Sequence, residues 1–252
     1  MNYLLEVCLA ANLAVTPWVV LTPGSPPQNS SLEASGEKRA DEKITREVEE
    51  GISVELPATR NARAMPEADR EDALIITVTA DGSLYRGVNP VRSAALIEEV
   101  KASLSERTDQ KLYIKADART RYANVEKVLD IARRAGVLAP ILLASERDSS
   151  KSDTPVAPRG FAVLVVPPFS ASSEPIVFEL LDSGRGWPAL EINHQNIHWT
   201  AFETTLSGLL ENRAEKVVLL KADARLPFAL IVDVGDRCRL IGAKVTLLVP
   251  GR

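Results

Sequence analysis

Cysteine, histidine and aromatic side chains are all scarce in this chain of 252 residues. Two cysteines, Cys8 and Cys238, are too few and too far apart to indicate a disulfide framework or a thiolate metal site. Two histidines exclude most histidine-based metalloenzymes, and a 5% share of aromatics argues against a stacking platform for sugars or bases. His194 and His198 flank a predicted turn without a third ligand, so we expect no metal site.

The chain also lacks an excess of positive charge, because its net charge is −4 and its pI is about 5.4. A protein that binds nucleic acid through phosphates is normally basic, so this class is disfavoured. No phosphate loop, dinucleotide fingerprint or nucleophile elbow occurs, and no close carboxylate pair has a suitable apolar setting. We therefore expect neither catalysis nor a cofactor.

Residues 4–22 form an apolar stretch that is interrupted by Glu6 and Pro17. Its length is near the lower limit for a helix that crosses a bilayer. A cleaved signal peptide would need a basic start and a small-residue cleavage site, and neither is evident. A lipoprotein signal would need small residues before Cys8. A short membrane anchor over residues 1–22 is the interpretation that remains.

Composition divides the rest of the chain into two bodies. Proline, serine and glycine, followed by a dense run of charges, mark a linker over residues 23–50, and a second polar break spans residues 145–160. The predicted domains are therefore residues 51–144 and 161–252.

The first body combines strand and helix patterns. Residues 51–57 predict a short strand closed by proline, and residues 73–87 predict a hairpin around Asp81-Gly82. The helix pattern over 92–106 places Ala95, Leu96, Val100 and Leu104 on one face. A strand is predicted next at 111–116. It is followed by a helix at 124–136, with Gly136 as its C-terminal cap, and by a buried strand at 137–145.

A repeat is the most informative feature of the sequence. The motif KADAR occurs at 115–119 and again at 221–225, and a shift of 106 residues aligns 115–143 with 221–249 without a gap. Eleven of these 29 positions are identical, among them Asp130/Asp236 and Arg133/Arg239. We predict a tandem duplication of one α/β domain. Upstream of the repeat, residues 190–199 lie where the first body has its hairpin. The apolar face of the first helix is repeated by Phe202, Leu206, Leu209 and Leu210. The second body also has an extra strand-like pair, at 162–166 and 175–181.

Three segments together resemble the ExbD/TolR family, the anchored subunits of proton-motive-force-driven energy transducers. They are GISVELP at 51–57, IITVTADGSLY at 75–85 and KLYIKADARTRYANVEKVLDIARRAGV at 111–137. The resemblance covers most of the first domain, and it covers the second mainly through the repeat. It implies two tandem α/β domains, each a two-layer α+β sandwich with two helices on one face of a small mixed sheet.

The N-terminal stretch fits the same family more faintly, through Leu4-Leu5-Glu6-Val7-Cys8-Leu9. Glu6 then takes the place of the carboxylate that exchanges protons within the membrane, although the family keeps Asp there. Burial in an apolar helix raises the pKa of a carboxyl group, which suits reversible protonation. The alternative is a Glu6 that is fully hydrated among lipid headgroups, five residues from the terminus.

The resemblance implies further candidates for partner binding, each with a structural alternative. Leu56 and Pro57 mark either a strand that exchanges between subunits or a plain strand end. An aspartate after each repeated strand contacts a partner, or else it caps the following helix or braces a turn. An aromatic residue contacts a partner or packs in the core. These pairs are Asp117 with Tyr122 and Asp223 with Phe228.

Two functions follow from these features. The first is a non-enzymatic accessory subunit of a TonB/Tol-type transport complex, with its anchor in the inner membrane and its globular domains in the periplasm. Its implied partners are an ExbB/TolQ/MotA-like proton-channel subunit and a TonB/TolA-like protein, and its two halves form an intrachain pseudo-dimer or it forms a homo-oligomer. The alternative is an envelope scaffold or binding module that has lost proton coupling.

Overall fold

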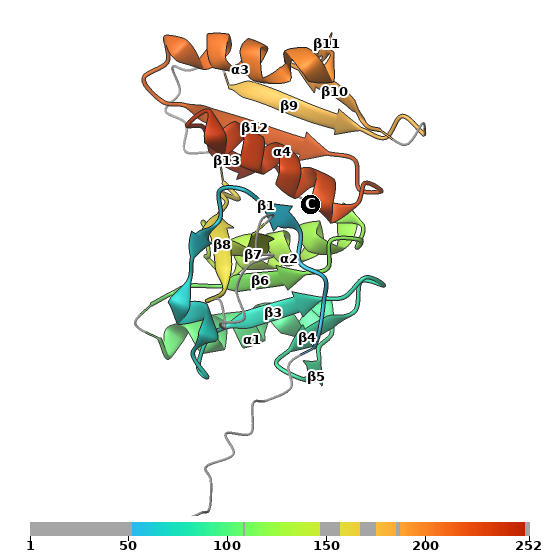
Figure 1. The fold of residues 1–252 in the computed structure, drawn as a ribbon. Coiled ribbons are helices and arrows are strands. Elements are labelled where there is room, and N and C mark those ends of the chain that lie inside the picture. Colours follow the sequence, from blue (N-terminus) through green and yellow to red (C-terminus); the bar gives the residue numbers. More distant parts are fainter. Residues whose placement is uncertain (1–51, 108, 147–156, 167–174, 185–186, 250–252) are drawn as a thin grey trace, which may run out of the picture. The chain divides into compact units, whose positions relative to one another are not determined.

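A computed structural model describes residues 52–107, 109–146, 157–166, 175–184 and 187–249 (Figure 1). The expected anchor, the first linker and Glu6 lie outside these residues. Within the described ranges, no helix combines the length and the apolar character needed to cross a membrane.

The first half of the described chain is a mixed α/β unit with one sheet and two α-helices. Its strand order is β2-β8-β7-β6-β3-β4-β5, with β1 pairing in parallel to the end of β7. The central strands β3, β6 and β7 are parallel, whereas β4 and β8 run antiparallel to their neighbours. The elements are β1 (Ala58–Thr59), β2 (Arg63–Ala64), η1 (Pro66–Asp69), β3 (Ile75–Val78), β4 (Leu84–Arg86), β5 (Asn89–Pro90), α1 (Ser93–Ser105), β6 (Tyr113–Ala116), α2 (Tyr122–Arg134), β7 (Ile141–Glu146) and β8 (Arg159–Ala162).

The second half is built on a sheet with the order β11-β10-β9-β12-β13. Here β9, β12 and β13 are parallel, and β10 is antiparallel to β9. The elements are β9 (Ile176–Leu181), β10 (Ala189–Ile192), β11 (Gln195–Ile197), η2 (Trp199–Ala201), α3 (Phe202–Glu211), β12 (Val217–Ala222), α4 (Phe228–Leu240) and β13 (Lys244–Leu247). The series β7-β6-β3-β4-β5 in the first sheet therefore has the same pattern as β13-β12-β9-β10-β11 in the second.

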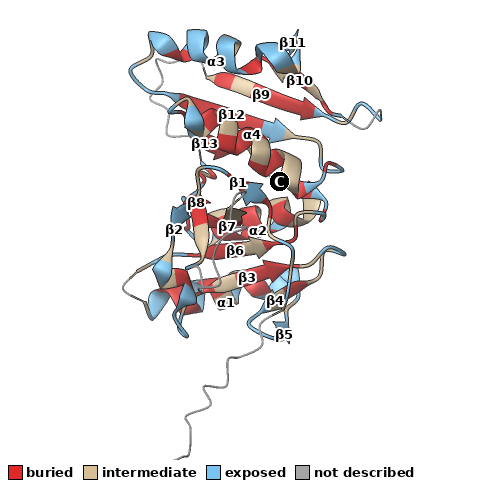
Figure 2. Ribbon diagram, in the orientation of Figure 1, coloured by how far each residue is buried: buried red, intermediate tan, exposed pale blue. Residues whose placement is uncertain are grey.

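The helix faces follow the apolar periodicity of the sequence. On α1, Leu96, Val100 and Leu104 are buried as predicted, whereas Ala95 is exposed. On α3, the buried residues are Phe202, Leu206 and Leu210, and Leu209 is 37% exposed. α1 packs beside α2, and α3 packs beside α4. Buried residues follow the strands and the inward helix faces of both halves (Figure 2).

One apolar cluster runs through both halves. It contains Leu96, Val125 and Leu129 from the first half together with Phe178 and Phe228 from the second. A smaller cluster on the first sheet contains Ala68, Tyr113, Ile141 and Leu143. Because the main cluster is shared, burial of apolar surface couples the stability of the two halves.

Two strand predictions need correction. Residues 52–57 are not a strand: the ladder begins at Ala58, because Pro57 has no N–H to donate and only its carbonyl bonds Ser145. The stretches 162–166 and 175–181 do not pair with each other. Arg159–Ala162 joins the first sheet as β8. Gly160 lies so close to the Leu142 carbonyl oxygen of β7 that an added Cβ would be 2.6 Å from it. Residues 175–181 instead supply β9 of the second sheet. The domain limits stay a prediction.

The hairpin predicted around Asp81-Gly82 is confirmed by the antiparallel pairing of β3 with β4. The Gly82 N–H donates to the Thr79 carbonyl, and Gly82 has a φ of +88°, a conformation that side chains other than glycine rarely adopt. A Cβ at this position would lie 2.3 Å from Asn124 Nδ2 on α2. Glycine therefore allows the turn and its close approach to the helix.

We expect Gly82→Ala to lower the free energy of unfolding by about 1–3 kcal/mol, because it combines backbone strain with displacement of the Asn124 side chain. Urea denaturation measures this change. Gly87→Ala is the matched control, since Gly87 has a φ of +59° and no atom within 4 Å of an added Cβ. A Gly82→Ala variant that is no less stable than Gly87→Ala would contradict the contact with Asn124.

Candidate functional site

Asp117 follows β6 and holds several N–H groups at the end of the first sheet. Its carboxylate accepts from Arg119 Nε and Nη2 at 2.9 Å each, from the Arg119 backbone at 3.0 Å and from the Glu55 backbone at 3.1 Å. Only 3% of the Asp117 side chain is exposed, against 67% for Arg119. The hydrogen bonds from Arg119 hold the pKa of Asp117 well below its usual value. At neutral pH the aspartate is thus an anion, and it fastens the segment before β1 to the sheet.

Asp223 has the same arrangement after β12 in the second half. It accepts from Arg225 Nε at 3.1 Å, from Nη2 at 2.8 Å and from the Arg225 backbone at 2.9 Å. These bonds lower the pKa of Asp223 to about 2. Arg225 also lies 3.5 Å from the Asp182 carboxylate, as Arg119 lies 3.6 Å from that of Glu55. Each KADAR motif therefore presents an exposed arginine whose fork is fixed by an aspartate.

The residues after the two motifs pair with each other across the two halves. The Tyr122 N–H donates to the Leu226 carbonyl, and the Phe228 N–H donates to the Thr120 carbonyl, both at 2.8 Å. Two more bonds, Ala123 N–H to the Ala224 carbonyl and Ala229 N–H to the Ala118 carbonyl, are 2.9 Å long and extend this antiparallel contact. Exchanging the two repeats, by a shift of 106 residues, converts each of these bonds into its reciprocal bond. The contact is therefore self-complementary, as in a two-fold dimer interface.

This pairing also explains how α2 and α4 begin. The first N–H groups of a helix have no partner within it. Arg121 and Pro227 are the N-caps, and neither makes a side-chain cap hydrogen bond. Backbone carbonyls from the opposite half accept these N–H groups instead. The only sequence signal of this contact was the lack of Ser, Thr, Asp or Asn at both caps within an aligned repeat.

Tyr122 and Phe228 are the first residues of α2 and α4, and both have 0% exposure. Burial raises the pKa of the Tyr122 hydroxyl well above its usual value, and that hydroxyl has no hydrogen-bond partner among the described residues. Both aromatic side chains therefore pack in the core. Each paired segment follows an aspartate, Asp117 or Asp223, and leads into the helix that begins with the aromatic residue.

Leu56 and Pro57 lead into a segment that extends from the first sheet to α4. Leu56 packs against the smaller apolar cluster, and Pro57 is buried. After β1, the Arg60 N–H donates to Asp236 Oδ2 at 2.8 Å, and Arg239 Nη1 donates to the Asn61 carbonyl at 3.3 Å. In the sequence, Asp236 and Arg239 stood out only as identical positions of the repeat. Their contacts with this segment were not predicted.

One group of possible metal ligands occurs among the described residues. Atoms of Glu179, Glu191 and His194 lie within 4.8 Å of one another. However, Lys221 Nζ lies 3.2 Å from Glu179 Oε2, and His194 Nδ1 lies 3.6 Å from Glu179 Oε1. The Glu179 carboxylate is thus already paired with a lysine ammonium.

Comparison with known proteins bears on the first half. The family model "Biopolymer transport protein ExbD/TolR" matches residues 44–146, which include Leu56, Pro57, Asp117 and Tyr122. The chain is 28% identical over 100 residues to the biopolymer transport protein ExbD of Escherichia coli K12, an alignment that covers 40% of this chain and 69% of the relative, and the same values hold for ExbD of Shigella flexneri.

The matches to the ExbD/TolR model and to ExbD confirm the resemblance for the first half. Asp223 and Phe228 lie outside the matched residues. The tandem duplication therefore remains a prediction, which depends on the aligned repeat and the shared strand order.

Proposed function

We propose that this chain is a non-enzymatic accessory subunit of a TonB/Tol-type transport complex driven by the proton-motive force. The observation that carries the proposal is the ExbD/TolR match over residues 44–146. In this role an N-terminal anchor lies in the inner membrane, and the globular part acts in the periplasm. The partners are an ExbB/TolQ/MotA-like channel subunit and a TonB/TolA-like protein.

We further infer that the two halves are duplicated domains that form a pseudo-dimer within one chain. The shift of 106 residues, the shared strand pattern and the reciprocal hydrogen bonds support this inference. A covalent connection keeps each half at a high effective concentration for the other. The pairing surface is consequently occupied within each chain.

The candidate residues take different parts in this proposal. Tyr122 and Phe228 are fully buried, so they act on a partner only by positioning the paired segments. Asp117 and Asp223 act through Arg119 and Arg225, whose side chains are 67% and 65% exposed. The two arginines are the groups that a partner can contact directly, while Leu56 and Pro57 hold the extended segment in place.

Glu6 supplies the proposed proton transfer within the anchor. We expect Glu6→Gln to abolish growth that depends on active outer-membrane uptake in a strain whose only copy of this gene carries the change, because glutamine cannot exchange a proton. Glu6→Asp is the matched control, since it keeps a titratable carboxyl group, and we expect it to support growth. Immunoblots of membrane fractions check that the variants accumulate equally.

Wild-type growth with Glu6→Gln would overturn proton coupling and would favour the envelope scaffold instead. Loss of growth with both Glu6→Gln and Glu6→Asp at normal protein levels would show that the position needs the glutamate side chain for a reason other than its proton.

A further inference from the structure

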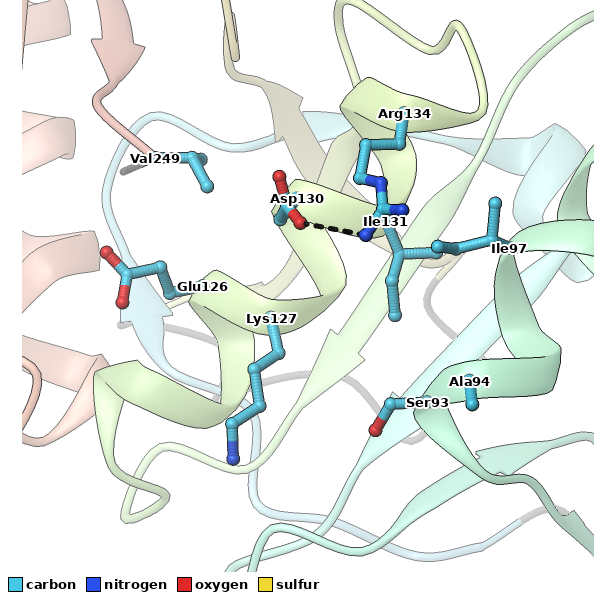
Figure 3. A pocket seen from close by; sticks show the side chains of 9 residues that line it. All are labelled: Ser93, Ala94, Ile97, Glu126, Lys127, Asp130, Ile131, Arg134 and Val249. Carbon is cyan, nitrogen blue, oxygen red and sulfur yellow. Dashed lines mark ion pairs between the residues drawn. The ribbon is translucent and has the colours of Figure 1, made fainter. Parts of the chain in front are cut away.

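A pocket of about 750 Å³ lies on α1 and α2, and the charges of its lining side chains compensate one another. Asp130 is paired with Arg133 Nη2 at 2.6 Å and with Arg134 Nη1 at 3.8 Å, and Figure 3 shows the second of these pairs. Lys127 and Arg134 supply two positive charges against the two carboxylates of the pocket, Glu126 and Asp130. No unmet charge therefore identifies a ligand here. A carboxylate without such compensation lies elsewhere, on the second sheet.

Two glutamates lie directly opposite each other on neighbouring strands of the second sheet. Glu179 on β9 pairs in register with Glu191 on β10, and the two strands are antiparallel. Like charges in this position repel each other, because the Cβ atoms of opposed residues are only about 5 Å apart. On its other side, Glu179 lies in register with Lys221 on β12, and their side chains form an ion pair of 3.2 Å. One lysine thus compensates one of the two carboxylates, and no hydrogen bond or ion pair joins the Glu191 carboxylate to another described residue.

His194 reaches this pair of carboxylates from the turn that joins β10 and β11. Ile192 pairs with Gln195, so the turn has only two residues. These are Asn193 and His194, with φ values of +49° and +66°, as in a type I′ hairpin. The Asn193 N–H donates to the Val177 carbonyl at 2.9 Å, and Asn193 Oδ1 accepts from the Val177 N–H at 2.8 Å. A turn fastened to β9 in this way keeps the imidazole within reach of the β9 carboxylate.

The three side chains place possible ligand atoms around one point. One atom each of Glu179, Glu191 and His194 lies within 4.8 Å of the other two. His194 Nδ1 is 3.6 Å from Glu179 Oε1. This is close to the separation of about 3.4 Å between two ligand atoms that bind one tetrahedral zinc ion at about 2.1 Å each. The lysine ammonium contacts the other oxygen of the carboxylate, Oε2. A cation can therefore bind Oε1 while the ion pair with Lys221 stays in place.

The surroundings of these side chains suit a set of metal ligands. The Glu179 side chain is only 11% exposed and is oriented by the lysine, whereas the His194 side chain is 81% exposed. A carboxylate held by a second hydrogen bond is a fixed ligand. The exposed imidazole is free to turn toward an ion, and water can take the coordination position that remains. Two carboxylate oxygens and one imidazole nitrogen favour Zn²⁺ and similar transition-metal ions over Mg²⁺ and Ca²⁺, which prefer oxygen ligands alone.

We propose that Glu179, Glu191 and His194 bind one divalent transition-metal ion of the Zn²⁺ type, and that water completes its coordination. The ion removes the repulsion between the opposed glutamates and links β9, β10 and the turn after β10. His198, the second histidine of the sequence, is not a ligand, because its Nδ1 bonds the Thr200 hydroxyl at 2.8 Å. This inference goes beyond the proposed transport function and does not depend on it.

Isothermal titration calorimetry of the metal-free full chain with ZnCl₂ at neutral pH tests the proposal. We expect a component with one ion per chain and a dissociation constant below about 100 μM. Glu191→Gln leaves the pair of Glu179 with Lys221 intact and should weaken this component roughly tenfold or more. His194→Asn should do the same, because asparagine tolerates the conformation of the turn but has no imidazole. His198→Asn is the matched control, since it removes the other histidine, and it should bind Zn²⁺ as the wild type does.

Two further measurements distinguish a specific site from a merely acidic surface. In NMR spectra of the ¹⁵N-labelled chain, Zn²⁺ should shift the Nδ1 resonance of His194 and leave that of His198 unchanged. Mg²⁺ in large excess should not displace Zn²⁺. Circular dichroism of each variant checks that it is folded.

Several results would overturn the proposal. They are the absence of a one-ion component, an equal Zn²⁺ affinity of wild type, Glu191→Gln and His194→Asn, and displacement of Zn²⁺ by Mg²⁺. A loss of affinity in His198→Asn as large as that in His194→Asn would place the ion between the two histidines, and would overturn it as well.

Discussion

Replacing Phe228 by alanine is expected to lower the free energy of unfolding by about 3–5 kcal/mol. Phe228 has 0% exposure and belongs to the apolar cluster that both halves share. Its truncation removes buried contacts and leaves a cavity beneath the paired segments. Urea denaturation followed by circular dichroism measures the loss. Because the cluster is shared, hydrogen exchange should increase in α2 as well as in α4.

The repeat supplies a matched control at Tyr122, which corresponds to Phe228 after the shift of 106 residues. Its hydroxyl is buried without a partner among the described residues, so Tyr122→Phe removes an unsatisfied polar group. We expect a change in stability of no more than about 1 kcal/mol, in the stabilising direction. A large loss on Tyr122→Phe would reveal a hydrogen bond to that hydroxyl. A loss below about 1 kcal/mol on Phe228→Ala would contradict a shared core.

The elements that depend on local signals could be predicted from the sequence. Apolar spacing located α1 and α2, and Asp81-Gly82 located the hairpin between β3 and β4. In these cases the determinant is a side-chain period or a turn residue that lies within the element. The ExbD/TolR resemblance of the first half, based on the same segments, is confirmed by the family match.

The elements that depend on distant partners could not be predicted. The strand pairs β1 with β7 and β2 with β8 involve only two residues of β1 and β2, too few for an alternating pattern. β8 joins the first sheet because Gly160 permits close approach to β7, which composition cannot show. The partners of the first N–H groups in α2 and α4 lie about a hundred residues away, so no local signal specifies them.

The candidate site was predicted in its members but not in its geometry. The sequence singled out Asp117 and Asp223 and left open whether they brace a turn; each one binds the arginine two residues later in its own KADAR motif. It did not identify Arg119 and Arg225 as the exposed members, although both belong to that motif. Partner binding at Asp117 and Asp223 stays a prediction.

Asp117→Ala is expected to lower the free energy of unfolding by about 2–3 kcal/mol at neutral pH. The change removes a buried anion and leaves the Glu55 and Arg119 N–H groups without an acceptor. It also releases the segment that leads into β1. The matched variant Asp223→Ala should cost about 1 kcal/mol, because the Asp223 side chain is 23% exposed and water can solvate the donors that remain. Equal losses for the two variants would contradict a special role of burial at Asp117.

The pH dependence provides a second test of the same carboxylate. The pKa of Asp117 is lower in the folded state than its ordinary value of 3.8, since Arg119 stabilises the anion. The folded state therefore binds this proton less readily than the unfolded state, and the associated stability is complete above pH 3.8 and declines as the pH falls through and below that value. Urea denaturation between about pH 6 and pH 2 should show a steep decline for wild type and a shallower one for Asp117→Ala. The two stabilities should converge in acid, because protonation removes from the wild type the same anion that the substitution removes. A difference that stays constant across this range would show that Asp117 contributes through its shape and not through its charge.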